Sequence, residues 1–174
     1  AAHDDDPFAR YEALQQLMVQ HLVEVVGGGN AVPREAIGDA LGAVLGDPAL
    51  DDLMRGELLV LPGEGYLAEQ FAAADPEAIR AAREGLKAWL GAELREEFAA
   101  LHARTSAVPY SLSAAARGAR KGKTQALVYL AAGVPELAAS LAAAQFDGAG
   151  NMTDRQGALM VLAGLDTPAR EARL

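Results

Sequence analysis

The sequence predicts an all-α fold, on three observations. Of its 174 residues, 39 are alanine and 24 are leucine, both strong helix formers. Aromatic residues make up 5%, and the β-branched residues that strands prefer are sparse. Apolar residues recur at steps of three and four, in segments separated by turns rich in glycine and proline. We therefore expect antiparallel helix pairs stacked as an α-superhelix, similar to a solenoid, in one helical domain spanning residues 1–174.

Proline marks where most of the helices should begin. A capping side chain before proline favours a helix start, because the cap accepts a hydrogen bond from an unpaired amide and proline has no amide hydrogen to leave unpaired. Pro33 and Pro135 mark two starts without such a cap, and Thr153 with Gln156 forms a capping box. Capping residues precede proline in four places: Asp6-Pro7, Asp47-Pro48, Asp75-Pro76 and Thr167-Pro168.

The first helix is expected over residues 7–26. It ends at the run 27–29, where glycine supplies the left-handed backbone that often closes a helix. The next helices are expected over 33–45, 48–59 and 66–73, each with apolar residues at helical spacing. The apolar stripe of the first helix comprises Phe8, Tyr11, Leu14, Met18, Leu22 and Val25.

The longest helix is expected over residues 76–102, where the helical spacing of apolar residues continues throughout. Gly85 and Gly91 weaken it by about 1 kcal/mol each relative to alanine and would allow a bend. After a loop up to Ser113, the following helices are expected over 113–132 and 135–146.

The last two helices are expected after the cap Thr153, ending near Gly164, and from Pro168 onward. The final one opens with a proline, and the sequence stops at Leu174, one and a half turns later. We infer from this that the chain is a fragment of a longer polypeptide.

Composition excludes several classes of protein. The 15 basic and 24 acidic residues give a net charge of −9, which argues against nucleic-acid binding. The absence of cysteine excludes disulfides, thiolate metal sites and a cysteine nucleophile. No apolar run approaches the roughly 18–20 residues that a membrane span needs, so we expect no membrane association.

One segment is close to a phosphate-binding loop. Residues 118–124, Gly-Ala-Arg-Lys-Gly-Lys-Thr, have three residues between the first glycine and Gly-Lys-Thr, where such a loop needs four. It should also follow a strand, whereas a helix is expected here. Nucleotide binding is therefore the less favoured interpretation, and a solvated helix face the favoured one.

No residue pattern predicts a metal site or an active site. His3, His21 and His102 lack partners at metal-ligand spacing, and we expect His21 to be a partly exposed helix residue. No Gly-x-Ser-x-Gly segment is present to anchor a hydrolase triad. The acidic residues Asp51, Asp52, Glu93, Glu96 and Glu97 are expected on solvated faces, and the aromatic residues Tyr66, Phe71, Trp89 and Phe98 in the core.

A basic run is the one candidate interaction site. Arg117, Arg120, Lys121 and Lys123 lie within seven residues, and the first three share a helix face. The run is either a solvated face or a patch that docks an acidic partner surface or another domain.

Several segments, in this order and spacing, resemble the C-terminal helical domain of the bacterial aminopeptidase N group of the M1 zinc metallopeptidase family. The similarity runs from about Asp4 to Arg173. As a set the segments are fairly specific, although any one alone would be weak. They are Asp-Asp-Asp-Pro-Phe-Ala-Arg-Tyr-Glu-Ala at 4–13, Leu-Pro at 61–62, Ala-Glu-Gln-Phe at 68–71, Asp-Pro-Glu-Ala-Ile at 75–79, Tyr-Leu at 129–130, Gln-Phe at 145–146 and Asn-Met-Thr-Asp-Arg at 151–155.

The resemblance implies a role without chemistry of its own. In that family a preceding catalytic domain carries a His-Glu-x-x-His zinc helix and a Gly-x-Met-Glu-Asn segment, neither of which occurs here. The helical domain closes over the catalytic cleft, admits peptides and continues beyond the position of Leu174. We therefore assign no catalytic or zinc residue to this chain, and the cofactor it implies is zinc in the parent enzyme only. The family tends to have stronger helix formers where this chain has Gly118 and Gly122.

The implied partners are the catalytic domain of the same polypeptide and the peptide substrates of the parent enzyme. Surface left exposed by truncation could also be hidden in a dimer. The family and the acidic N-terminal residues imply a cytoplasmic location, since a signal peptide would be basic there. The alternative is a stand-alone helical-repeat module that binds a protein in its concave groove.

Overall fold

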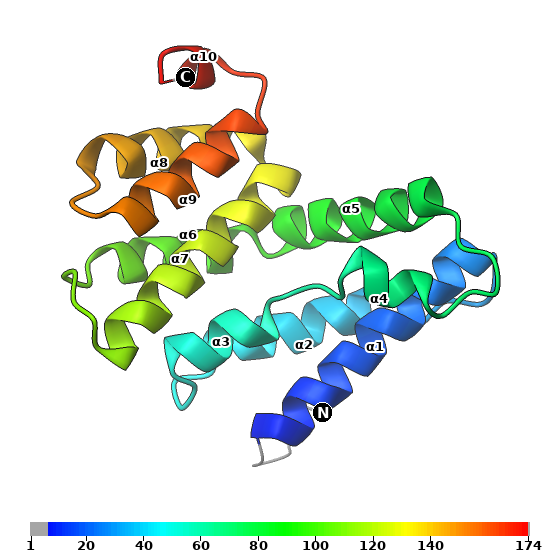
Figure 1. Cartoon of the computed structure of the whole chain (residues 1–174). Coiled ribbons are helices and arrows are strands. Elements are labelled where there is room, and N and C mark those ends of the chain that lie inside the picture. The colour runs from blue at the N-terminus through cyan, green and yellow to red at the C-terminus, as the bar shows by residue number, and fades with distance from the viewer. Residues whose placement is uncertain (1–6, 174) are drawn as a thin grey trace.

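The computed structural model describes residues 7–173 and confirms the all-α prediction (Figure 1). The predicted cap Asp6 and the residue His3 lie outside the described residues, as does the side chain of Phe8. The described chain contains only helices as regular structure: α1 Pro7–Gly27, α2 Arg34–Gly46, α3 Asp52–Leu58, α4 Glu64–Ala68, α5 Pro76–Glu93, α6 Arg95–Ser106, α7 Ala114–Gly133, α8 Pro135–Gly148, α9 Met152–Ala163 and α10 Pro168–Glu171.

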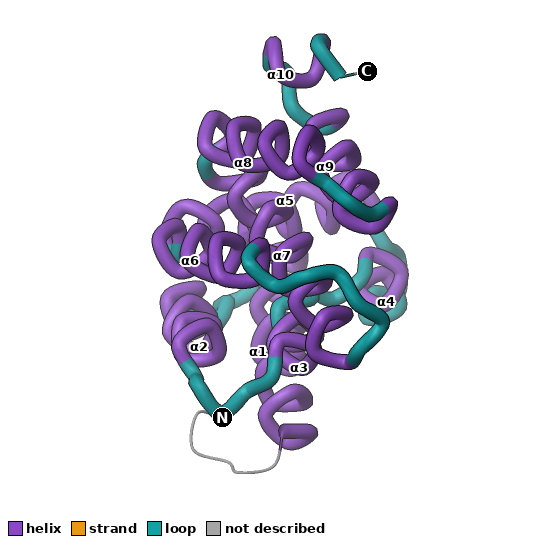
Figure 2. Tube along the Cα trace, turned by 90° about the vertical axis from the view of Figure 1, so that its left-hand side faces the viewer, coloured by secondary structure: helices purple, strands orange, loops and turns teal. Residues whose placement is uncertain are grey.

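The helices stack in tiers, with α1 to α3 at one end, α5 to α7 in the middle, and α8 and α9 beyond them (Figure 2). Helix α7 is the central element, because it packs against α3, α5, α6, α8 and α9. Helices α1 and α10 lie at opposite ends of the molecule (Figure 1). This is the stacked, solenoid-like arrangement that the sequence predicted.

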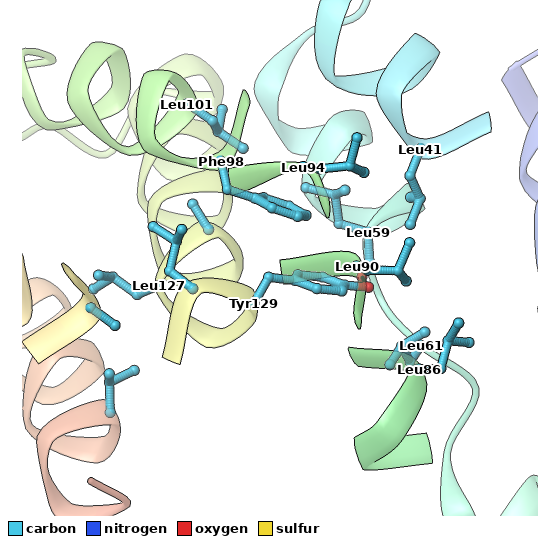
Figure 3. Packing of buried hydrophobic residues seen from close by; sticks show 14 of the residues in the cluster. Leu41, Leu59, Leu61, Leu86, Leu90, Leu94, Phe98, Leu101, Leu127 and Tyr129 are labelled. Atoms are coloured by element: carbon cyan, nitrogen blue, oxygen red, sulfur yellow. Dashed lines mark hydrogen bonds between the residues drawn. The ribbon is translucent and has the colours of Figure 1, made fainter. Parts of the chain in front are cut away.

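A stacked aromatic pair joins two helices of the middle tier, and a hydrogen bond from one of the two rings reaches the first tier (Figure 3). The rings of Phe98 on α6 and Tyr129 on α7 are stacked, with centroids 4.5 Å apart. The hydroxyl of the buried Tyr129 donates a 2.8 Å hydrogen bond to the carbonyl of Leu59, the residue that ends α3. Burial raises the pKa of Tyr129 far above its usual range, so this hydroxyl stays protonated and remains a donor. Leu90 and Leu94 pack around the two rings.

The predicted helix over 76–102 is interrupted at Leu94, which separates α5 from α6. Leu94 has φ −102° and ψ 31°, away from helical values, yet its amide still bonds to the carbonyl of Leu90 and its own carbonyl accepts from Phe98. The interruption is therefore a sharp bend rather than a loop. Neither Gly85 nor Gly91 forms it. Buried Leu94 instead points toward α2, where its Cδ2 would lie 3.5 Å from a Cβ added at Gly42.

The starts of α3 and α9 differ from the predicted ones because other residues cap them. Helix α3 begins at Asp52, because Asp51 rather than Asp47 accepts the capping hydrogen bond, from the amide of Met54 at 2.8 Å. Asp47 instead accepts from the amide of Ala49 and forms a turn. Helix α9 begins two residues earlier than predicted, because Asn151 rather than Thr153 caps it, accepting from the amide of Asp154.

Of the other predicted helix boundaries, some are confirmed and some are not. Asp75 caps α5 as expected, accepting from Glu77 and Ala78. Thr167 precedes α10, but its side chain makes no capping hydrogen bond. Helix α4 begins and ends earlier than predicted. Tyr66 on α4 is 56% exposed, so its assignment to the core was wrong, whereas Phe98 is fully buried.

Candidate functional site

The four residues of the predicted basic run do not form one surface. Lys123 is buried and its ammonium lies 2.8 Å from Asp154 Oδ2. Lys121 forms an ion pair with Glu57 on α3. Arg120 stacks on Tyr110 and donates to the carbonyl of Ser111. Arg117 is exposed. Two of the four basic side chains, Lys121 and Lys123, therefore form ion pairs with other helices.

The segment that is close to a phosphate-binding loop lies within α7, as the helical prediction required. Its glycines allow close helix contacts. A Cβ at Gly118 would collide with the backbone of Leu53 on α3, and a Cβ at Gly122 would touch Leu101 and Thr105 on α6. Gly118 thus has a packing role in this chain, where the backbone of α3 approaches α7 closely.

Both histidines within the described residues are buried. His21 was expected to be partly exposed, but it is 9% exposed, and its Nδ1 lies 2.6 Å from the carbonyl of Val32. His102 is also buried. Within residues 7–173, no three His, Asp or Glu side chains cluster in a way that could hold a metal ion.

The acidic residues mostly lie on the surface, as predicted. Glu93, Glu96 and Glu97 are exposed on α5 and α6. Asp52 is the exception. It is only partly exposed and pairs with Arg104 on α6 at 2.8 Å, joining α3 to α6.

A polar cleft between α6, α7 and the α8–α9 turn is the best candidate site in the described chain. Its volume is about 440 Å³, in the range of small-molecule sites. We define the polar cleft by five side chains on its floor: His102, Lys123, Gln145, Asn151 and Asp154. It alone brings together a buried lysine, a carboxylate and a buried histidine.

The floor of the polar cleft is a connected hydrogen-bond network. Asp154 Oδ2 accepts from Asn151 Nδ2 at 2.8 Å, in addition to its ion pair with Lys123. Gln145 Nε2 donates to the carbonyl of Asp154 at 2.8 Å, and Gln145 Oε1 lies 3.0 Å from His102 Nε2. The network thus links one side chain or backbone group from each of α6, α7, α8 and α9.

The network also fixes the protonation of His102. Because the amide nitrogen of Gln145 donates to the carbonyl of Asp154, its oxygen faces His102 and accepts a hydrogen bond from Nε2–H. Burial lowers the pKa of His102, and the nearby charge of Lys123 lowers it further. The hydrogen bond to Gln145 acts in the opposite direction and raises it. His102 is therefore neutral at pH 7.

Chemically, the polar cleft is better suited to joining helices than to catalysis. Its one carboxylate is held by Lys123 and Asn151, and its histidine by Gln145. Among the described residues of the cleft, no hydroxyl or carboxylate lies in hydrogen-bond contact with the histidine as a nucleophile would. Asp154 Oδ1 is buried and has no hydrogen-bond partner among the described residues.

The sequence did not point to this cluster, although one signal was present. Positions 116, 119, 123, 126 and 130 form the buried stripe of α7, and Lys123 occupies a core position in it. The Asn-Met-Thr-Asp segment singled out above now has a structural role, because Asn151 caps α9 and Asp154 pairs with Lys123.

Comparison with known proteins gives the chain its family. A family model described as "Domain of unknown function (DUF3458_C) ARM repeats" matches residues 1–174. Aminopeptidase N of Escherichia coli (strain K12) is 32% identical over 174 residues, covering 98% of this chain and 20% of that protein. Aminopeptidase N of Caulobacter vibrioides is 34% identical over 173 residues, with the same two shares. The chain thus spans about a fifth of the length of these relatives.

A solved structure confirms the fold. The crystal structure of Legionella pneumophila aminopeptidase A in complex with aspartic acid superposes with a TM-score of 0.81 at 24% identity, covering 97% of this chain and 21% of that one. The chain therefore belongs to this family of helical ARM-repeat domains. Within the family, it is the C-terminal helical domain of an aminopeptidase N-like protein.

Proposed function

We propose that this chain is a non-catalytic part of a zinc-dependent aminopeptidase, and that it lies over the catalytic cleft and restricts which substrates enter. The main support is the match of the whole chain to a fifth of each aminopeptidase N relative, which leaves room in such a protein for a separate catalytic domain. On this proposal the zinc ion and the general base that activates water belong to that domain. The natural partners are the catalytic domain and peptide substrates, in the cytoplasm.

The physical support for this proposal is the rigidity of the helical array. A gate that admits peptides and excludes folded proteins must keep its shape against a substrate. In this chain the tiers are tied by polar contacts between helices that are distant in sequence, such as Tyr129 to Leu59 and Lys123 to Asp154. These bonds fix the angles between helices more firmly than apolar contact alone, because hydrogen bonds are directional.

The experiment compares the complete enzyme with a version lacking residues 1–174. We measure kcat/KM for an aminoacyl anilide, a nine-residue peptide and a folded protein with a structured N-terminus. Gating predicts that the anilide and the peptide change by less than tenfold, while hydrolysis of the folded protein rises at least tenfold. Unchanged selectivity in a shortened enzyme that still cleaves the anilide would contradict the proposal.

A second measurement covers the case in which the shortened enzyme does not fold. The isolated chain should neither hydrolyse an aminoacyl anilide nor hold zinc after dialysis, as measured by emission spectrometry. Stoichiometric zinc in the isolated chain would disprove a non-catalytic role.

The ARM-repeat description supports a second candidate, a stand-alone helical module that binds a protein. The two are separated by sequencing the natural reading frame on both sides. A frame that runs upstream into a His-Glu-x-x-His helix supports the gate. Start and stop codons that bracket Ala1 and Leu174 support the binding module.

A further inference from the structure

The loop between α6 and α7 carries an exposed surface that is both apolar and basic. Tyr110 is 59% exposed and Leu112 77% exposed, large values for side chains of this size. Arg117 and Arg120 follow on the first two turns of α7, three residues apart and so on one side of the helix. We call these four residues the loop patch. Tyrosine and arginine are enriched at protein interfaces.

Two of the four side chains of the loop patch, Tyr110 and Arg120, are held in place before a partner binds. The guanidinium of Arg120 lies 5.0 Å from the centre of the Tyr110 ring, and its Nη1 donates to the carbonyl of Ser111 at 3.0 Å. These two contacts hold the loop against α7. Because the side chains are already placed, a partner would pay little entropy to fix them.

The charge of the loop patch is not compensated locally. Residues 98–135 include five arginines and lysines and no aspartate or glutamate, in a chain whose net charge is −9. Three of the five, Arg104, Lys121 and Lys123, pair with carboxylates of other helices. In the part of the chain that the structure describes, Arg117 and Arg120 form no ion pair.

We propose that the loop patch docks an acidic, apolar-anchored segment of the same polypeptide, outside residues 1–174. The two unpaired arginines require carboxylates, and Tyr110 and Leu112 require an apolar side chain. The source is the same polypeptide because relatives are about five times longer than this chain, which covers 20% of them. Contacts between domains of one chain are typically of this mixed polar and apolar kind.

This inference rests on the proposed function only in placing the chain within a longer aminopeptidase. The test reads contact and not hydrolysis, so the docking and the gating can fail separately. The probe is nitration of Tyr110 by tetranitromethane, quantified by mass spectrometry, in the complete protein and in the isolated chain. Docking predicts at least tenfold slower nitration of Tyr110 in the complete protein.

Charge-reversed variants connect the protection to the arginines. Arg117→Glu in the complete protein should restore nitration of Tyr110 at least fivefold, and with Arg120→Glu the rate should approach that of the isolated chain. Arg117→Glu is the cleaner variant, because Arg117 makes no hydrogen bond or ion pair among the described residues. The matched control is Arg80→Glu with Arg95→Glu, two exposed arginines on α5 and α6, which should leave Tyr110 protected.

Three outcomes would overturn the proposal. The first is equal nitration of Tyr110 in the complete protein and the isolated chain, which would point to a separate partner or to none. The second is protection in the isolated chain that grows with concentration, which would indicate a second copy of the chain. The third is protection that persists in the Arg117→Glu and Arg120→Glu variants, since the carboxylates of the partner would then have no role.

Discussion

The ion pair of Lys123 and Asp154 lies where charge is costly unless it is paired. The two side chains are 7% and 13% exposed, and Asn151 completes the shell of the carboxylate. Removing one member of a buried pair leaves the other uncompensated, which usually costs more than the pair itself contributes. The pair therefore contributes to the conformational specificity of the fold, because it fixes the position of α9 on α7.

Asp154→Asn should lower the free energy of unfolding by about 3 kcal/mol, because Lys123 then keeps a buried charge without a counterion. Replacing both residues, as Lys123→Met with Asp154→Asn, should cost clearly less than Asp154→Asn alone. Urea unfolding followed by circular dichroism measures the free energy of unfolding of the native chain and of each variant. The control is Asp147→Asn, which removes a carboxylate that pairs with Arg173 on the surface and should change little. Equal losses in the single and double variants would show that the buried charge is not the cause.

The lowered pKa of His102 makes stability depend on pH. In the unfolded chain this histidine titrates near its ordinary value of 6.5, whereas in the folded chain its pKa is lower. Between the two values the unfolded state binds one more proton, so stability falls as the pH drops below 6.5 and is independent of this group above it. The slope approaches about 1.4 kcal/mol per pH unit.

His102→Gln removes that slope, because glutamine does not titrate. We expect the native chain to lose more stability than the variant between pH 7.5 and 5.5, as measured by urea unfolding at four pH values. His3 and His21 are present in both proteins, so they cancel in the comparison. Parallel pH profiles would show that His102 titrates alike in the folded and unfolded states.

Helices α5 and α7 cross with their backbones close together. A Cβ at Gly91 would overlap the carbonyl oxygen of Tyr129, and a Cβ at Gly133 would overlap the backbone of Gly91 and Ala92. At this crossing the two backbones are in contact, and no side chain fits between them. Gly91 therefore serves packing, although the sequence suggested that it would bend its helix.

Gly91→Ala and Gly85→Ala form a matched pair on one helix. Gly91→Ala should destabilise the chain by about 3 kcal/mol or more, since α5 and α7 must move apart and α7 contacts five other helices. Gly85→Ala should stabilise it by up to about 1 kcal/mol, because nothing lies within 4 Å of the new methyl group and alanine is the better helix former. Thermal and urea unfolding of both variants check this. Opposite signs are the key result, and a shared sign would contradict the packing argument.

The sequence predicted helices well where the signal is local. Asp75 caps α5 and Pro135 begins α8, because a cap and its amides lie within four residues. The bend at Leu94 has no local signal, since no glycine or proline stands there. Leu94 itself is buried near Gly42 of α2, more than fifty residues away in the chain, a contact that no local pattern can reveal. In the same way, Lys123 was assigned to a basic surface because its partner Asp154 belongs to another helix.

At the scale of the whole molecule, stacked helices contact mainly their neighbours in the array. Helices α8 and α9 pack on each other and on α7, and they have no substantial contact with α1 to α3. The polar cleft adds directional bonds between α8–α9 and the rest of the array. They run from His102 on α6 to Gln145 on α8 and from Lys123 on α7 to Asp154 on α9. In such an array, loss of the bonds between two neighbouring layers should destabilise the helices beyond them and leave the helices at the far end unchanged.

Hydrogen exchange followed by mass spectrometry tests this in the Asp154→Asn variant at neutral pH, under conditions where the chain remains folded. We expect amides of α8 and α9 to exchange at least tenfold faster than in the native chain, because the pair then opens without unfolding the rest. Amides of α1 and α2 should keep their native rates, and those of α7 should change less than those of α9, because α3 and α5 still cover α7. A uniform acceleration across all helices would mean that the chain opens only as one cooperative unit, and that the polar cleft stabilises the whole array rather than its last pair.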